Sequence, residues 1–297
     1  MRGRALTLCA LLLAAAVPDA GAQEIVRRIG RVTFRVDATR AFPGGVVVVR
    51  LAARGRIGAA WALLDGRRVP FYSDRGTPRA LVPMAASAGA GPATLGVELA
   101  ARGGAQRIAI PITIAAREYQ PRYVFLDEEA RALVARPDAA RDGRRLLALL
   151  RTESPMPAPG PLSSPVGATG NGFGEPRTHT GSADVETRTD ALQGERHRGL
   201  DYPLPVGTPV RAPAAGTVLF AGPLTLSGET VVIDHGQGVL SVLQHLSRVD
   251  TRLGDVVPSA AVVGLSGATG LAPEPMLQWR VYLHGVPVDP TALALLL

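Results

Sequence analysis

Every histidine of this 297-residue chain lies at or beyond residue 179, so metal or acid–base chemistry is expected in the second half. His197 and Asp201 form an H-x3-D pair that could ligate one metal ion if Gly199 between them lets the backbone bend. Zinc favours imidazole nitrogen and carboxylate oxygen, and a catalytic zinc site needs three protein ligands and a water. A pair at this spacing is also common by chance, and a surface ion pair is the alternative interpretation.

Two further histidines lie at the ends of predicted strands. His245 ends the strand in "GVLSVLQHLS" and could polarise a carbonyl group or stabilise an oxyanion, although a half-buried structural histidine gives the same pattern. His235 precedes Gly236 in "VVIDHGQG", where a hydrogen-bonded turn residue is the simpler interpretation. Taken singly, these residues do not decide between catalysis and structure.

The order and spacing of motifs across residues 165–297 resemble the LytM/lysostaphin family of zinc endopeptidases, metallopeptidase family 23. The motifs are H-x-G-x-D, G-T-P-V with A-x-x-x-G-x-V, V-x-I-D-H-G-x-G, H-L-S, G-D, G-x-x-G-x-T-G and V-D-P. The resemblance implies an all-β domain with a duplicated hybrid motif. It also implies a zinc ion that activates water to cleave peptidoglycan peptide cross-links. It places His197 and Asp201 at zinc-ligand positions and His245 at the histidine that assists catalysis.

The segment "EPMLQWRV", residues 274–281, departs from this family where an H-x-H pair is expected. Residues i and i+2 of a strand face the same side, so the first histidine can act on the transition state while the second binds zinc. Met276 and Gln278 occupy these catalytic and metal positions. Met276 cannot transfer a proton, and the amide oxygen of Gln278 is a poor zinc ligand beside imidazole. Zinc is therefore expected to bind weakly or not at all, and the chain is interpreted as a degenerate member or pseudoenzyme.

The remaining histidines offer little replacement for the missing pair. His284 lies six residues after Gln278, too far along an extended strand, and is expected at a hairpin. His179 precedes the motifs in a polar stretch and stays open as a ligand of an altered site. Gly199 and His235 belong to the matching motifs and are expected at the groove.

The composition and strand pattern predict a mainly β protein with two β domains. Residues 23–118 contain short segments such as "RVTFRV" and "RIAIPITIAA" between Gly, Pro, Asp and Ser signals, which predicts an immunoglobulin-like β-sandwich. A helical segment is expected at 119–153 and a Pro-, Gly- and Ser-rich linker at 154–170. The LytM-type domain is expected at 171–297.

Three local signals sharpen this division. Asp65 and Gly66 in "LLDGRRVPFY" predict a hairpin turn. Asp127 is the expected N-cap of the helical segment, and Pro137 is expected to divide that segment into two helices.

Residues 1–22 have the features of a secretory signal peptide: a basic start, an apolar run and a small-x-small cleavage site ending at Ala22. Cys9, the only cysteine, lies inside the run, so the mature chain is expected to have neither a disulfide nor thiol chemistry. The mature protein is therefore expected in the periplasm or outside the cell, without a transmembrane helix. All 32 basic residues are arginines, and the net charge of +7 is read as scattered solvated arginine.

Three functions remain open at this stage. The first is a non-catalytic LytM-domain protein that binds peptidoglycan or regulates a cell-wall amidase or another envelope protein, as the resemblance implies for degenerate members. The second is an active zinc endopeptidase with an altered site. The third is a structural envelope protein in which both β domains serve interaction alone. No nucleic-acid partner is expected, because no nucleic-acid motif is found.

Overall fold

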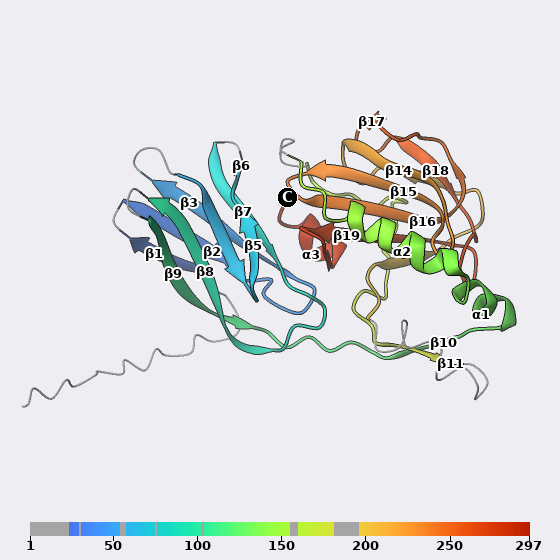
Figure 1. The fold of residues 1–297 in the computed structure, drawn as a ribbon, viewed down its shortest axis with the longest axis horizontal. Coiled ribbons are helices and arrows are strands. Elements are labelled where there is room, and N and C mark those ends of the chain that lie inside the picture. The colour runs from blue at the N-terminus through green and yellow to red at the C-terminus, as the bar shows by residue number, and fades with distance from the viewer. Residues whose placement is uncertain are drawn as a thin grey trace, which may run out of the picture.

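The computed structural model describes residues 24–29, 31–53, 58–74, 76–101, 104–154, 160–180 and 196–297. The described chain is mainly β, as predicted, with two β domains joined by a short helical connector (Figure 1). The expected signal peptide at residues 1–22 lies outside the described residues. None of the helices in the described ranges is long and apolar enough to cross a membrane.

The N-terminal domain is a β-sandwich. Its described strands form one sheet in the order β1-β2-β3-β7-β6 and a second in the order β5-β4-β8-β9. The bounds are β1 Glu24–Ile29, β2 Val32–Asp37, β3 Val46–Ala53, β4 Ala60–Leu64, β5 Arg67–Pro70, β6 Tyr72–Asp74, β7 Thr77–Pro83, β8 Gly91–Ala101 and β9 Gly104–Ile114. Alternate residues, such as Val47 and Val49 of β3 and Ile110 and Ile112 of β9, fill one core shared by both sheets. The immunoglobulin-like subtype stays a prediction.

The hairpin between β4 and β5 confirms the turn expected at Asp65 and Gly66. Leu64 pairs with Arg67, and the two turn residues have φ of 49° and 74°. Positive φ at both central residues is typical of a type I′ turn, which Asp-Gly favours because glycine carries no Cβ.

A connector of strands and helices leads from the sandwich to the C-terminal domain. Its elements are β10 Arg122–Phe125, α1 Glu128–Val134, α2 Pro137–Leu149 and β11 Arg177–Thr180. The carboxylate of Asp127 accepts a hydrogen bond from the backbone of Ala130, which confirms the predicted N-cap. Pro137 is the first residue of α2, so it divides the two helices as expected. The parallel pairing of β10 with β11 was not predicted.

The C-terminal domain is built on a sheet with the strand order β12-β19-β16-β15-β14-β17, to which β13, β18 and β20 are joined. The bounds are β12 Leu200–Pro203, β13 Pro209–Arg211, β14 Gly216–Leu224, β15 Gly228–Gly236, β16 Val239–Val249, β17 Val256–Val257, β18 Val262–Ser266, β19 Met276–Leu283 and β20 Val286–Val288. A last helix, α3, spans Pro290–Ala294. The central strands β15, β16 and β19 are buried on both faces, in keeping with their nearly continuous apolar sequences.

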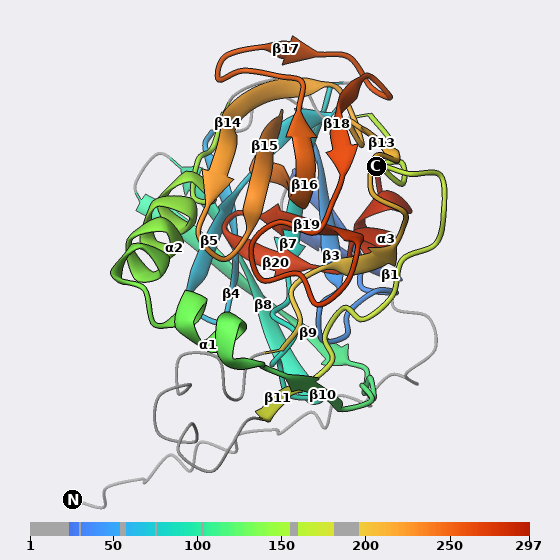
Figure 2. The same ribbon diagram turned by 90° about the vertical axis from the view of Figure 1, so that its right-hand side faces the viewer.

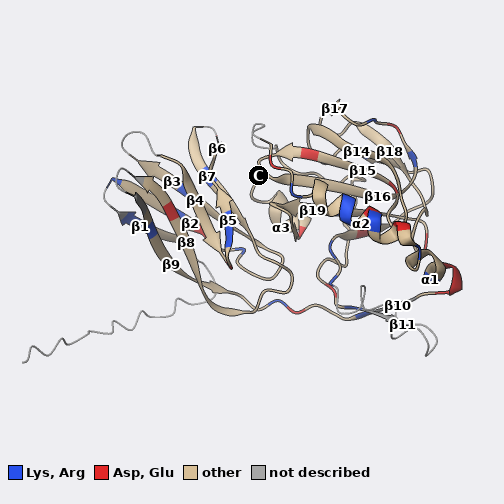
Figure 3. Cartoon of the chain, in the orientation of Figure 1, with Lys and Arg blue, Asp and Glu red and all other residues tan. Residues whose placement is uncertain are grey.

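Helix α2 covers one face of this sheet (Figure 2). Leu146 and Leu150 of the connector pack with Phe220, Val242 and Tyr282 of the sheet. Figure 3 shows the charged residues of α2, among them Arg141, which forms an exposed ion pair with Asp138 at 2.9 Å. The connector is therefore part of the C-terminal core rather than a free tether.

The two β domains also pack directly on one another (Figure 1). Val46 and Val48 of β3 point away from the sandwich core and join the hydrophobic core of the C-terminal domain. Arg117 forms a 2.7 Å ion pair with Asp289, and the backbone N–H of Asp289 donates to the carbonyl of Gly44 at 2.8 Å. Both faces of β3 are thus buried, which fits its uninterrupted run of valines.

Candidate functional site

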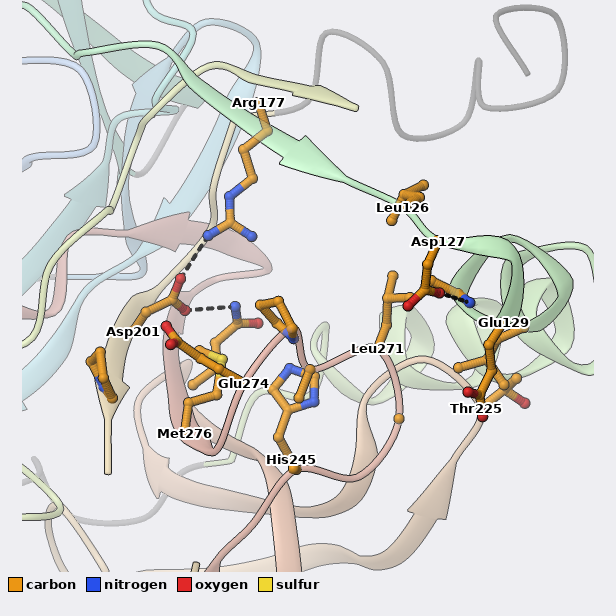
Figure 4. Close-up of a pocket in the computed structure, with 18 of the residues that line it drawn as sticks. Leu126, Asp127, Glu129, Arg177, Asp201, Thr225, His245, Leu271, Glu274 and Met276 are labelled. Atoms are coloured by element: carbon orange, nitrogen blue, oxygen red, sulfur yellow. Dashed lines mark hydrogen bonds and ion pairs between the residues drawn. The ribbon is translucent and has the colours of Figure 1, made fainter. Parts of the chain in front are cut away.

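Most of the candidate residues meet in a cleft of about 1110 Å³ on the C-terminal domain (Figure 4). Asp201, His245, Met276 and Gln278 line its inner part. The connector supplies the outer part through α1 and the β10–β11 pair, and the loop before β19 closes another side. Figure 4 shows Arg177 reaching toward Asp201, with the side chains of α1 opposite them.

The strand register brings two of these side chains together. Asp201 of β12 pairs with Gln278 of β19, and Gln278 pairs on its other side with Gln244 of β16. Directly paired residues of an antiparallel sheet share a face, so the side chains of Asp201 and Gln278 are neighbours. Strand alternation puts Met276 and Arg280 on the same face as Gln278. The sheet, not a flexible loop, therefore holds this end of the cleft.

The side-chain amide of Gln278 lies between His197 and Asp201, the two residues predicted as zinc ligands. Its Nε2 donates to Oδ1 of Asp201 at 2.9 Å and to Nε2 of His197 at 2.9 Å. All three side chains are buried, with exposed fractions of 6% or less. The amide thus bonds the two atoms that the family resemblance predicts as metal ligands.

Arg280 fixes the orientation of this amide, because its Nε donates to Oε1 of Gln278 at 2.6 Å. A guanidinium has only donors and an ionised carboxylate only acceptors, so the amide nitrogen must face Asp201. The amide then needs a lone pair on Nε2 of His197, whose Nδ1 donates to the carbonyl of Gly172 at 2.8 Å. His197 is therefore neutral, in agreement with burial, which lowers its pKa. The 3.1 Å contact between Nε2 of His197 and Oδ1 of Asp201 is bridged by the amide and is not itself a hydrogen bond.

Asp201 keeps its negative charge although it is buried. Burial acts to raise its pKa, but the positive charge of Arg177 and the hydrogen bond from Gln278 outweigh burial and hold the pKa well below its ordinary value. The shortest contact of this carboxylate is the hydrogen bond from Nη2 of Arg177 to Oδ2 at 2.7 Å. Each oxygen of this carboxylate thus has a donor from the protein, as a buried charge requires.

His245 is a buried neutral base that lines the cleft. Its Nδ1 donates to the carbonyl of Thr269 at 2.8 Å, which leaves Nε2 as the acceptor. Burial lowers the pKa of His245 to about 4. Its backbone has φ of 65°, a left-handed conformation that is uncommon outside glycine and is often seen at functional positions. The arrangement could accept a proton from a water or hydroxyl group in the cleft.

Met276 has an apolar side chain at the first position where the resemblance predicts an H-x-H pair. It is 3% exposed, pairs with Pro203 of β12 and donates its backbone N–H to the carbonyl of Gly267 at 2.8 Å. Its thioether is at most a weak hydrogen-bond acceptor. No proton transfer can therefore take place at this position.

Gly199 and His235 lie away from the lining of the cleft. A Cβ on Gly199 would lie 2.5 Å from the carbonyl oxygen of Trp279, so this glycine permits the close approach of the chain to β19. His235 is 1% exposed and bonds through Nδ1 to the carbonyl of Ala215 and through Nε2 to Oγ of Ser241. Both residues therefore support the sheet instead of the groove to which the motif comparison assigned them.

The two remaining histidines are His284 and His179. His284 lies in the turn after β19, as expected, with φ of 50°. Its Nδ1 bonds to Oε1 of Glu153 at 2.9 Å, at the junction with the N-terminal domain. The backbone of His179 belongs to β11, but its side chain lies outside what the structure describes.

The donor set does not fit a zinc ion. Only His197 and Asp201 are ligands of the type that zinc prefers, whereas a zinc site requires three or four. The oxygen of Gln278 is engaged with Arg280, and its nitrogen is a donor and cannot ligate. Within the described ranges, no group of three or more His, Cys, Asp or Glu side chains could hold a metal.

Fold and site together resemble a domain of the zinc-peptidase type, and the amide of Gln278 lies where the resemblance predicts a third metal ligand. The model of Peptidase family M23 matches residues 195–290 of this chain. A crystal structure of a Pseudomonas aeruginosa protein assigned to peptidase M23 covers 86% of this chain and 95% of its own. The two are 29% identical, with a TM-score of 0.59, so the likeness includes the N-terminal domain and the connector.

Two curated relatives have more specific names. The DD-carboxypeptidase/endopeptidase Mpg of Neisseria meningitidis serogroup B is 39% identical over 99 residues, which are 33% of this chain and 23% of the relative. The peptidoglycan DD-endopeptidase ShyA of Vibrio cholerae is 34% identical over 93 residues, which are 31% of this chain and 22% of the relative. The chain thus matches less than a quarter of the length of these two relatives.

The sequence interpretation missed the arginines that complete the site. Arg280 had a signal, because it lies two residues after Gln278 on the same strand and must share its face. Arg122 and Arg177 had none, because the parallel pairing that brings them to Asp201 joins segments that are far apart in the sequence.

Proposed function

We propose that this chain is an exported, cell-wall-associated M23-domain protein with impaired catalysis, which acts as a binding module or as a regulator of separate wall hydrolases. One observation carries the proposal: the amide of Gln278 bonds both His197 and Asp201 in the place of a third metal ligand. Peptidoglycan is the proposed ligand because the family members that match the domain include peptidoglycan endopeptidases. A wall amidase or another envelope protein is the proposed partner.

Digestion of purified peptidoglycan tests this proposal. The full mature chain, incubated with zinc, should release no muropeptides, and metal analysis should find little bound zinc. The double variant Met276→His with Gln278→His should bind zinc and serves as the positive control for folding and metal supply. Muropeptide release or stoichiometric zinc in the unchanged protein would establish the alternative, an active endopeptidase with an altered site.

The alternative has one observation in its favour, which is the neutral His245 with its free acceptor nitrogen. If a weak activity exists, it should depend on this histidine. His245→Gln should then abolish muropeptide release, whereas His235→Gln, at a buried histidine outside the cleft, should retain release in the folded fraction. The inactive proposal expects no release from any of these proteins.

Partner and location need separate measurements. Affinity capture with the full chain from an envelope fraction should retrieve a wall amidase if the protein is a regulator. Absence of any amidase, together with binding to isolated peptidoglycan, would leave the binding-module role. Recovery of the protein with residue 23 as its first residue from the periplasm or medium would support export, and a chain still beginning at Met1 would oppose it.

A further inference from the structure

Two arginines converge on a single oxygen of Asp201 at the inner end of the cleft. Nη2 of Arg177 lies 2.7 Å from Oδ2 of Asp201, and Nη1 of Arg122 lies 4.0 Å from the same atom. The arginines are direct partners in the parallel β10–β11 pairing, so the backbone sets their separation. Only the shorter contact is a hydrogen bond. The guanidinium of Arg122 is therefore beside a carboxylate oxygen that another donor already uses.

Arg280 adds a third positive charge next to Gln278. It bonds the neutral amide of Gln278, and it makes no ion pair within the part of the chain that the structure describes. Two guanidinium groups thus lie at the carboxylate of Asp201, and a third lies at the amide that bonds this carboxylate. The site has lost a metal ligand but has retained an excess of positive charge.

The exposure of Arg122 and Arg177 makes them accessible to a ligand in the cleft. The side chain of Arg122 is 44% exposed and that of Arg177 is 20% exposed, and both line the cleft. A guanidinium presents several N–H groups in one plane, and this arrangement matches the two oxygens of a carboxylate. A ligand carboxylate that approached from the cleft would reach Arg122 first, without displacing any hydrogen bond of Asp201.

The remaining lining narrows the class of ligand. Asp127, Glu129 and Glu274 also line the cleft, together with apolar side chains such as Leu271 and Met276. A polyanion would meet these three carboxylates, whereas a peptide with one carboxylate and a free amine would find opposite charges for both. The cleft therefore favours a short zwitterionic peptide over a phosphate-rich polymer.

We propose that Arg122 and Arg177 form a carboxylate subsite that binds the free C-terminus of a short peptide in the cleft. This inference rests on the proposed function, because it assigns a ligand to a groove that binds peptides without cleaving them. The guanidinium groups replace the electrostatic attraction of the metal but provide no water activation. The peptide is consequently held with its terminus, not its scissile bond, at the former metal position.

Calorimetric titration of the full mature chain tests the subsite. The probes are a wall-like pentapeptide with a free N-terminal amine whose only carboxylate is its C-terminus, and the same pentapeptide with a C-terminal amide. We expect the acid to bind at least about tenfold more tightly than the amide, as one charge-assisted hydrogen bond would give. Arg122→Gln should remove this difference. The matched control is Arg136→Gln, because Arg136 lines the same cleft but bonds Asp138 at 3.4 Å.

Several outcomes would overturn the subsite. Equal affinity of acid and amide, or an unchanged preference in Arg122→Gln, would do so even if peptidoglycan remains uncleaved, so the proposed inactivity could survive. Arg122-dependent binding of an amidated peptide with internal glutamates, but not of the free-acid pentapeptide, would assign the arginines to an acidic protein partner instead. Cleavage of the pentapeptide would refute the proposed function itself. Circular dichroism of each variant confirms that it is folded.

Discussion

Replacement of the Gln278 amide is the most direct test of the hydrogen bonds that hold the site together. Gln278→Leu keeps the side-chain volume nearly constant and removes three hydrogen bonds, to Asp201, His197 and Arg280. A hydrogen bond between neutral groups contributes about 1 kcal/mol, and one to a charged group about 1.5–3 kcal/mol. Asp201 retains Arg177, and Arg280 is half-buried and can recover water, so we expect a net loss of about 3 kcal/mol.

Thermal and urea unfolding of the full chain measure this loss. A destabilisation of about 3 kcal/mol should lower the Tm by roughly 6–12 °C for a chain of this size. Leu277→Met, at a neighbouring buried apolar position, is the matched control and should cost no more than about 1.5 kcal/mol. If Gln278→Leu is as stable as the unchanged chain, the amide does not hold Asp201 and His197, and our explanation of the site is wrong.

A second substitution at the same position reverses the pH dependence. In Gln278→Glu, one carboxylate oxygen still accepts the hydrogen bond from Arg280. The other oxygen replaces the amide nitrogen and faces Asp201, so His197 must carry a proton on Nε2 to bridge the two carboxylates. Its folded-state pKa then rises above the unfolded value. The stabilisation is fully present below the unfolded pKa and is lost as the pH rises through the folded pKa. The variant should therefore be more stable, relative to the unchanged chain, at pH 5 than at pH 8.

Three further predictions concern zinc, acid and the domain junction. Gln278→His should bind about one zinc ion per chain in metal analysis, because it provides a third ligand, whereas Met276→His alone should not. Burial lowers the pKa of His245 to about 4, so its contribution to stability is fully present above its unfolded pKa. The free energy of unfolding, measured in urea, should fall by about 3 kcal/mol as the pH drops from 6.5 to 4. Arg117→Ala leaves the carboxylate of Asp289, 6% exposed, without its ion pair and should cost about 3 kcal/mol in urea unfolding.

Each of these three predictions would be contradicted by a specific result. Zinc binding by Met276→His alone would mean that the positions of ligand and catalytic histidine are exchanged. A urea midpoint that does not change between pH 6.5 and 4, or that changes equally in His245→Gln, would show that this histidine is not buried as a neutral group. An unchanged midpoint in Arg117→Ala would mean that the junction does not depend on the ion pair with Asp289.

The register of β19 could be predicted because it depends on neighbours in the sequence. Strand alternation puts residues i and i+2 on one face, so the sequence alone was enough to assign Met276 and Gln278 as a pair. The same reasoning applies to the cap at Asp127 and the break at Pro137, where the signal lies within one helical turn. Local patterns were sufficient for these elements.

The hydrogen bonds of the site could not be predicted in this way. Arg177 reaches Asp201 only because β11 pairs with β10, and neither strand has a periodic pattern long enough to identify it. His235 was assigned to the groove because a motif gives the position of a residue in the sequence but not the direction of its side chain. Its ring instead bonds inside the sheet. The hydrogen-bond partners of these buried polar atoms come from segments that are distant in the sequence.

The two substitutions at the H-x-H positions have different physical consequences. Met276 only fills space, so an apolar residue of similar size would serve as well. Gln278 has a further requirement, because a chain without the metal must still stabilise the buried charge of Asp201. An uncompensated buried charge costs several kcal/mol, which is a large part of the stability of a domain. The amide of Gln278 and the guanidinium of Arg177 provide this compensation from opposite sides of the carboxylate. If the site binds no metal, as we propose, the buried charge of Asp201 needs such donors, and this requirement can be recognised by its hydrogen bonds.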